Sequence, residues 1–148
     1  EQLELLKKNK VAVVCGILSG TLASLTGIFV LCMLFGFNHK QYVTMLPKSI
    51  TTAIGIGISE ELGGIVTITV AVIIITGILG NVIADTVFHI FKIKNPLAKG
   101  LALGTASHAI GTARAIEMGP VEGAMSSLAV AVAGLLTVVF VSGFAQLI

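Results

Sequence analysis

Residues 104–114 read Gly-Thr-Ala-Ser-His-Ala-Ile-Gly-Thr-Ala-Arg, a polar stretch deep within a very apolar chain. If the stretch is helical, its 3-4-3 spacing brings four residues to one face: Gly104, Ser107, Gly111 and Arg114. That face is small and polar, with His108 at its edge. Hydrocarbon tolerates such groups only where they face protein or a wet cavity. We therefore predict that this stretch contributes to the binding site of a membrane transport protein.

The composition of the chain is that of an integral membrane protein. Its 148 residues are 55% hydrophobic and 11% charged, whereas a soluble domain is typically about 25% charged. The net charge of +2 says little about nucleic acid, but the chain has no Trp and no basic cluster interleaved with aromatics, so no nucleic-acid partner is expected. The chain starts at Glu1, and its polar opening Glu1–Lys10 resembles a loop between spans. We expect the chain to be part of a longer protein.

Three long apolar stretches predict transmembrane helices at about residues 11–37, 65–91 and 124–148. The first would be about 40 Å long as a helix, enough to cross a bilayer core of about 30 Å with tilt. Within it, Gly16, Gly20 and Ser24 recur every four residues and indicate close packing of a neighbouring helix. We expect an all-α fold, a polytopic transmembrane helical bundle formed by residues 1–148 as a single transmembrane domain.

Two further stretches, residues 42–64 and 97–117, are apolar but interrupted by polar residues, Gly or Pro. In the first, Pro47 and Lys48 interrupt the pattern, and a proline removes a backbone donor and disturbs the preceding turn. Such segments are best explained as broken or re-entrant helices buried among others. A pair of them in one membrane domain is typical of a transporter site in an inverted-repeat fold. Ser59 is predicted to cap a helix that starts at Glu60.

Two groups of lysines constrain the topology. The positive-inside rule places both in the cytoplasm: Lys7, Lys8 and Lys10 near the start, and Lys92, Lys94 and Lys99 after the second span. Both assignments hold only if an even number of crossings separates the groups. Residues 42–64 must then enter and leave on one side, so re-entrance is favoured over a full crossing.

A helix that begins within the membrane exposes unpaired N–H groups and the positive end of its dipole, which suit an anion. Lys48 and Arg114 would add full charges. The remaining candidate substrate-binding residues are Ser49, Thr51, Thr52, Ser107, His108, Gly111 and Thr112. Such a set suits a small hydroxy- or oxo-carboxylate. The alternatives are that Lys48 extends to an interface, that Arg114 pairs with Glu117, and that His108 only packs.

A polar stripe near the end of the second span consists of Asn81, Asp85 and His89 at i, i+4 and i+8. The stripe fits either an interfacial helix end or a proton or sodium site that involves Asp85. Catalysis finds no support, because Ser107 and His108 are adjacent and would point about 100° apart on a helix. The histidines lack metal-ligand spacing, and no cofactor is expected.

Residues 104–114, together with Glu117, residues 121–123 and residues 126–128, resemble the signature of the LrgB/CidB family. Leu46-Pro-Lys-Ser-Ile-Thr-Thr52 resembles the second hallmark of that family, and the likeness covers essentially the whole chain. Family members commonly carry further spans ahead of this region.

The resemblance implies two functions. Bacterial members are described as holin- or antiholin-like modulators of murein hydrolase activity and cell lysis, with a small membrane partner of the LrgA/CidA type. Plant relatives are plastid glycolate/glycerate translocators, and bacterial ones are linked to pyruvate uptake. We accordingly expect a multi-pass protein of the bacterial inner membrane, homo-oligomeric, that transports a two- or three-carbon carboxylate with H⁺ or Na⁺. The alternative is a holin-like assembly without a defined substrate.

Overall fold

The computed structural model describes residues 2–148, and its elements within that range are helices. Three helices are long and apolar enough to cross a membrane: α2 (Lys10–Leu34), α5 (Val66–Ile90) and α7 (Pro120–Ala145). The predicted helical membrane bundle with three spans is therefore confirmed. The third span begins at Pro120 rather than at residue 124, because proline suits the first turn of a helix and its missing N–H is unpaired there in any case.

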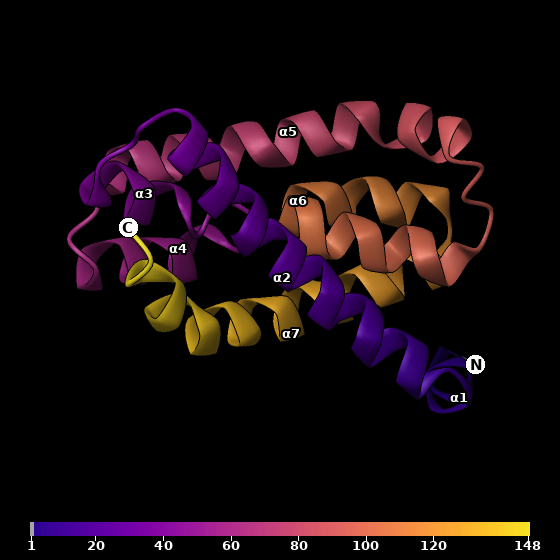
Figure 1. Ribbon diagram of the computed structural model, residues 1–148. Coiled ribbons are helices and arrows are strands. Elements are labelled where there is room, and N and C mark those ends of the chain that lie inside the picture. The colour runs from indigo at the N-terminus through magenta and orange to yellow at the C-terminus, as the bar shows by residue number, and fades with distance from the viewer. Residues whose placement is uncertain (1) are drawn as a thin grey trace.

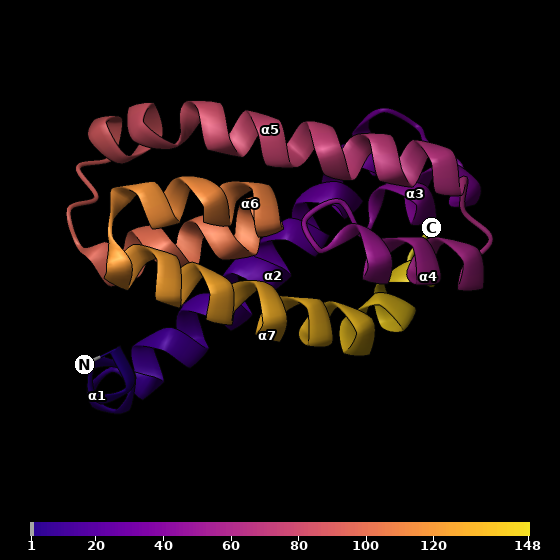
Figure 2. The same cartoon turned by 180° about the vertical axis from the view of Figure 1, so that it is seen from behind.

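Four other helices complete the chain: α1 (Gln2–Lys8), α3 (His39–Met45), α4 (Thr52–Glu61) and α6 (Pro96–Met118). In Figure 1, α5 runs along one edge of the molecule, α7 runs along the opposite edge, and α6 lies between them. Helix α2 crosses α6 and α7 obliquely, and the reverse view in Figure 2 shows α3 and α4 gathered at the end of the bundle opposite α1. The opening residues, expected as a loop, form the short helix α1.

Helix α6 is a hairpin of two arms rather than one helix. His108 has a φ of 44° and a ψ of −139°, which breaks the helix between a first arm (residues 96–107) and a second arm (residues 109–118). A Cβ added at Gly111 would lie 2.9 Å from the Leu103 oxygen, although eight residues of straight helix span about 12 Å. The two arms run side by side in Figures 1 and 2. The single polar face predicted for residues 104–114 is therefore wrong, because the chain reverses within the stretch.

The segment that contains α3 and α4 also returns to the end of the bundle where it starts. At its beginning, the Tyr42 hydroxyl donates to the Phe144 carbonyl in the last turn of α7, at 2.8 Å. At its end, the Ile65 N–H donates to Thr44 Oγ1 of α3, also at 2.8 Å. The start of the segment thus contacts the C-terminal end of α7, and the end of the segment returns to contact α3. The predicted re-entrance is confirmed.

The two re-entrant segments enter from opposite ends. Leu6, Leu97 and Val121 pack in one apolar cluster, so α1, the start of α6 and the start of α7 share an end of the bundle. The groups Lys7–Lys10 and Lys92–Lys99 consequently lie at that same end, as the even number of crossings requires. The hairpin α6 enters from this basic end, and α3–α4 enters from the other.

Glycines allow the first arm of α6 to lie close to both α2 and α7. On the α2 side, Cβ atoms added at Gly16 and Gly20 would lie 3.2 Å from Leu101 Cδ1 and 2.8 Å from Thr105 Oγ1. On the α7 side, a Cβ at Gly104 would lie 2.4 Å from the Ser126 carbonyl oxygen. The predicted packing role of Gly16 and Gly20 is confirmed, and the neighbour they contact is the first arm, whereas Ser24 donates to Ser49 between α3 and α4.

Three buried hydroxyl residues join the start of α5 to the re-entrant segment. Thr69 Oγ1 lies 2.9 Å from the Thr44 carbonyl oxygen and 2.8 Å from Ser59 Oγ. Ser59 and Thr69 are both fully buried. Ser59 lies near the end of α4, so the prediction that it caps a helix starting at Glu60 is wrong. Buried hydroxyls require partners, and these residues satisfy one another.

We expect Thr69→Val to lower the stability of the protein by roughly 1–3 kcal/mol, because it leaves Ser59 and the Thr44 carbonyl without their buried partner. Thermal unfolding followed by circular dichroism in detergent measures the effect. Thr67→Val is the matched control, since Thr67 is exposed on the same helix. Equal melting temperatures for the two variants would contradict the structural role of the cluster.

Candidate functional site

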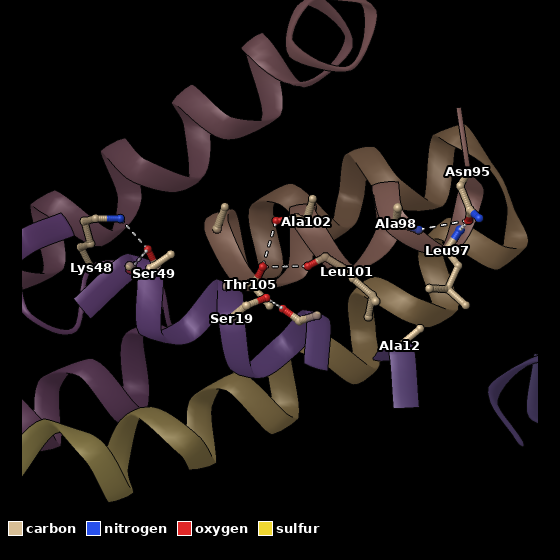
Figure 3. Close-up of a pocket in the computed structure, with 15 residues that line it drawn as sticks. Ala12, Ser19, Lys48, Ser49, Asn95, Leu97, Ala98, Leu101, Ala102 and Thr105 are labelled. Carbon is tan, nitrogen blue, oxygen red and sulfur yellow. Dashed lines mark hydrogen bonds between the residues drawn. The ribbon is translucent and has the colours of Figure 1, made fainter. Parts of the chain in front are cut away.

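A pocket of about 770 Å³ lies between α2, the first arm of α6 and the turn between α3 and α4. Figure 3 shows Lys48 and Ser49 at one end of it and Asn95 at the other. Small apolar residues form most of its wall, and its polar lining residues are Ser19, Ser24, Lys48, Ser49, Asn95 and Thr105. Lys48 is the one charged residue among the lining residues, and none of them is acidic.

Lys48 reaches this pocket because the chain turns between α3 and α4. Its ammonium donates to Ser49 Oγ at 2.7 Å, and Ser24 Oγ of α2 donates to the same oxygen at 3.0 Å. Since Ser49 Oγ accepts twice, its own hydrogen remains free to donate. Lys48 is half-buried and forms no salt bridge within residues 2–148. An ammonium in such a setting is costly unless an anion or other acceptors satisfy it.

His108 fixes the tip of the α6 hairpin against α5. Its Nε2 lies 2.8 Å from the Ile73 carbonyl oxygen. A carbonyl can only accept, so Nε2 carries the hydrogen. Gly77 provides the space, since a Cβ there would lie 2.7 Å from the imidazole carbon Cε1. His108 is 3% exposed and does not line the pocket.

The other predicted tip residues also make internal contacts. The Ser107 side chain lies against Gly80 of α5, and Gly111 lies against Ser107. The Thr112 hydroxyl bonds to the His108 carbonyl at 2.9 Å and to Ser126 Oγ at 2.8 Å. None of these residues lines the pocket that contains Lys48. They hold the hairpin in position beside the pocket.

Arg114 lies outside the Lys48 pocket. It lies on the second arm, where it pairs with Asp85 of α5 and, at 2.6 Å, with Glu117. The Asn81 amide donates to the Ile110 carbonyl one turn earlier at 3.0 Å, so the second arm runs parallel to α5 and away from the tip. Lys48 and Arg114 therefore do not share one cavity. The alternative prediction, that Arg114 pairs with Glu117, is confirmed. The coupling role of Asp85 stays a prediction.

Thr51 and Thr52 begin α4. Thr51 has an extended backbone and makes no side-chain capping bond, and Thr52 is the first residue of the helix. Neither lines the pocket. Four polar lining residues, Ser19, Ser24, Asn95 and Thr105, were not predicted as site residues. Ser24 was predicted as a packing position in the small-residue stripe, and Thr105 lies in the quoted stretch without a predicted role.

Three spanning helices, two re-entrant segments from opposite ends and a pocket between them define a polytopic helical membrane protein. The chain belongs to the LrgB-like family, which it matches over residues 1–147.

Curated relatives of the chain include proteins of two Bacillus species. The chain is 39% identical over 148 residues to the antiholin-like protein LrgB of Bacillus subtilis (strain 168), covering 100% of this chain and 64% of that protein. It is 40% identical over 144 residues to the antiholin-like protein LrgB of Bacillus cereus (strain B4264), covering 97% of this chain and 63% of that protein. The chain therefore spans less than two thirds of the length of these relatives. No solved structure matches it.

Proposed function

We propose that the chain forms the substrate site of a transporter for small hydroxy- or oxo-carboxylates of two or three carbons, such as glycolate, glycerate, pyruvate or lactate. The observation that carries this proposal is Lys48, an ammonium without an acidic partner in a pocket without acidic lining residues. The counter-charge would come from the substrate.

The polar groups in the pocket suit the two ends of such a molecule. The carboxylate accepts from the Lys48 ammonium and from the free hydrogen of Ser49, both charge-assisted bonds. In a hydroxy acid, the substrate hydroxyl would lie toward Thr105 and Ser19 on the facing helices and donate to one of them, because the Ser19 hydroxyl, like that of Thr105, donates to a backbone carbonyl of its own helix. The Thr105 hydroxyl donates to the Leu101 carbonyl at 2.8 Å, so its oxygen is available to accept a substrate hydroxyl.

Re-entrant segments from opposite ends support exchange of a substrate between the two sides of a membrane. Under the positive-inside rule, the end with the lysines faces the cytoplasm of a bacterium, and the membrane is the inner one. The coupling ion would be H⁺ or Na⁺. This assignment makes the α6 hairpin the cytoplasmic element and α3–α4 the outer one.

A second candidate function follows from the names of the relatives, which are antiholin-like proteins. In that case the protein would control lysis through a homo-oligomer, with a small LrgA/CidA-type membrane protein as its partner. The two functions can coexist, because a change in carboxylate flux across the membrane can alter cell lysis indirectly.

Uptake of labelled glycolate, pyruvate and lactate into proteoliposomes tests the proposal. A transporter gives saturable uptake that unlabelled substrate competes, with a trapped dye retained. Dye leakage without saturable uptake would instead favour the holin-like function and would overturn transport.

A further inference from the structure

A second pocket, of about 580 Å³, lies where α5 ends and α6 begins, and it is separate from the one that contains Lys48. Its cationic lining residues are Lys92, Lys94 and Lys99, and His89 also lines it. Phe88 and Ile93 supply its apolar surface. The geometry points to a binding site for the phosphodiester headgroup of an anionic phospholipid, which would accept from the lysines while its acyl chains lie along α5.

The charge of this pocket is strongly positive. Lys92, Lys94 and Lys99 form no salt bridge within the part of the chain that the structure describes. Asp85 lines the pocket as its one acidic residue, and its carboxylate is bound by Arg114. The pairing with Arg114 thus removes the one lining charge that would repel an anion.

The lysines project from a fixed turn. The Lys92 and Ile93 N–H groups donate to the His89 and Phe88 carbonyls, at 3.2 Å and 2.8 Å. Lys92 takes a φ of 54°, which turns the chain sharply after α5. The Lys99 ammonium lies 5.8 Å from the centre of the Phe88 ring, a distance at which cation and ring attract. An ordered turn presents cationic groups at lower entropic cost than a mobile one.

The position of the pocket favours a lipid as the source of the phosphate. Ile90, the last residue of the spanning helix α5, and Phe91, which follows it, adjoin the pocket in sequence and are 65% and 71% exposed. A lipid whose phosphate contacts Lys92 would thus find apolar surface for its acyl chains directly beside it. Basic pockets between helices at the cytoplasmic end of a membrane span are typical binding sites for lipid headgroups.

The other lysine group at this end of the bundle provides a contrast. Lys7, Lys8 and Lys10 carry the same charge. The pocket of about 400 Å³ beside them contains Lys10 but is otherwise lined by Leu, Ile and Val. Only the group at the end of α5 combines three lysines with a shared pocket.

Binding of phosphatidylglycerol and phosphatidylcholine to the purified protein, counted by native mass spectrometry, tests the site. The variant Lys92→Gln/Lys94→Gln/Lys99→Gln is compared with its matched control Lys7→Gln/Lys8→Gln/Lys10→Gln. We expect the wild type and the control to prefer phosphatidylglycerol, and the pocket variant to lose roughly tenfold or more of that preference, since each lysine near the membrane surface attracts anionic lipid. Circular dichroism verifies folding, and Lys94→Gln alone should give a partial loss.

Equal loss in both triple variants would overturn the proposal, because surface charge alone would then explain lipid preference. Inorganic phosphate provides the other arm of the test. If it displaces phosphatidylglycerol at comparable concentration, the pocket is a site for free phosphate and the lipid assignment is wrong. Neither outcome depends on whether the protein transports a carboxylate.

Discussion

Replacing Lys48 by glutamine is expected to raise the KM for the transported carboxylate by at least about tenfold, which corresponds to roughly 1.4 kcal/mol. Truncating one partner of a buried, hydrogen-bonded charge pair typically costs about 2–5 kcal/mol of binding free energy. An increase in KM of more than tenfold would therefore also agree with the binding role of Lys48. Lys48 is the one charged lining residue of the pocket, and glutamine keeps a polar side chain, one atom shorter, without the charge. Initial uptake rates over a range of substrate concentrations measure KM.

Three further variants define the contribution of Lys48. Lys48→Arg keeps the charge and should retain part of the affinity. Lys40→Gln removes an exposed lysine of α3 and should leave KM unchanged. Arg114→Gln should also leave KM nearly unchanged, because Arg114 is outside the pocket. Wild-type KM in Lys48→Gln would contradict the binding role of Lys48, and a large effect of Arg114→Gln would favour the original sequence interpretation.

The spans and breaks of the fold could be predicted because they depend on composition along the chain. A run of apolar residues long enough for the bilayer predicts a span whatever its neighbours are. Pro47 marked the turn between α3 and α4 directly, since proline cannot donate. The reversal at His108 carried no such mark, because positive φ is uncommon outside glycine. Contacts with Ile73 and Gly77, far away in sequence, hold it there.

Only the part of the candidate site that depends on a local break in the chain could be predicted from the sequence. Lys48 and Ser49 follow a local break, and the structure brings both to the pocket. Arg114 was assigned to that site through helical spacing from Gly104, which holds only if the helix continues. Its partner Asp85 lies 29 residues away in sequence and was recognised only as part of a stripe on its own helix. Pairing between helices is tertiary information that spacing along one helix does not contain.

Gly104→Ala is expected to destabilise the protein by roughly 1–3 kcal/mol, the usual cost of adding a methyl group to a filled core. The new Cβ would lie 2.4 Å from the Ser126 carbonyl oxygen and 2.7 Å from Ala129 Cβ. The nearest atom belongs to the backbone of α7, so no side-chain rotation can relieve the contact. The first arm must then move away from α7 and toward α2, which narrows the pocket between α2 and that arm. Thermal unfolding in detergent measures the loss of stability, and substrate uptake measures the effect of the narrower pocket.

Gly27→Ala is the matched control for this substitution, because a Cβ at Gly27 of α2 would meet no atom within 4 Å. Alanine is the better helix former by about 0.8–1 kcal/mol, so this variant should melt at the same or a higher temperature and keep its uptake. If the Gly104→Ala and Gly27→Ala variants had the same melting temperature, the first arm and α7 would tolerate a wider separation. The close approach that positions Thr105 beside the pocket would then not depend on glycine.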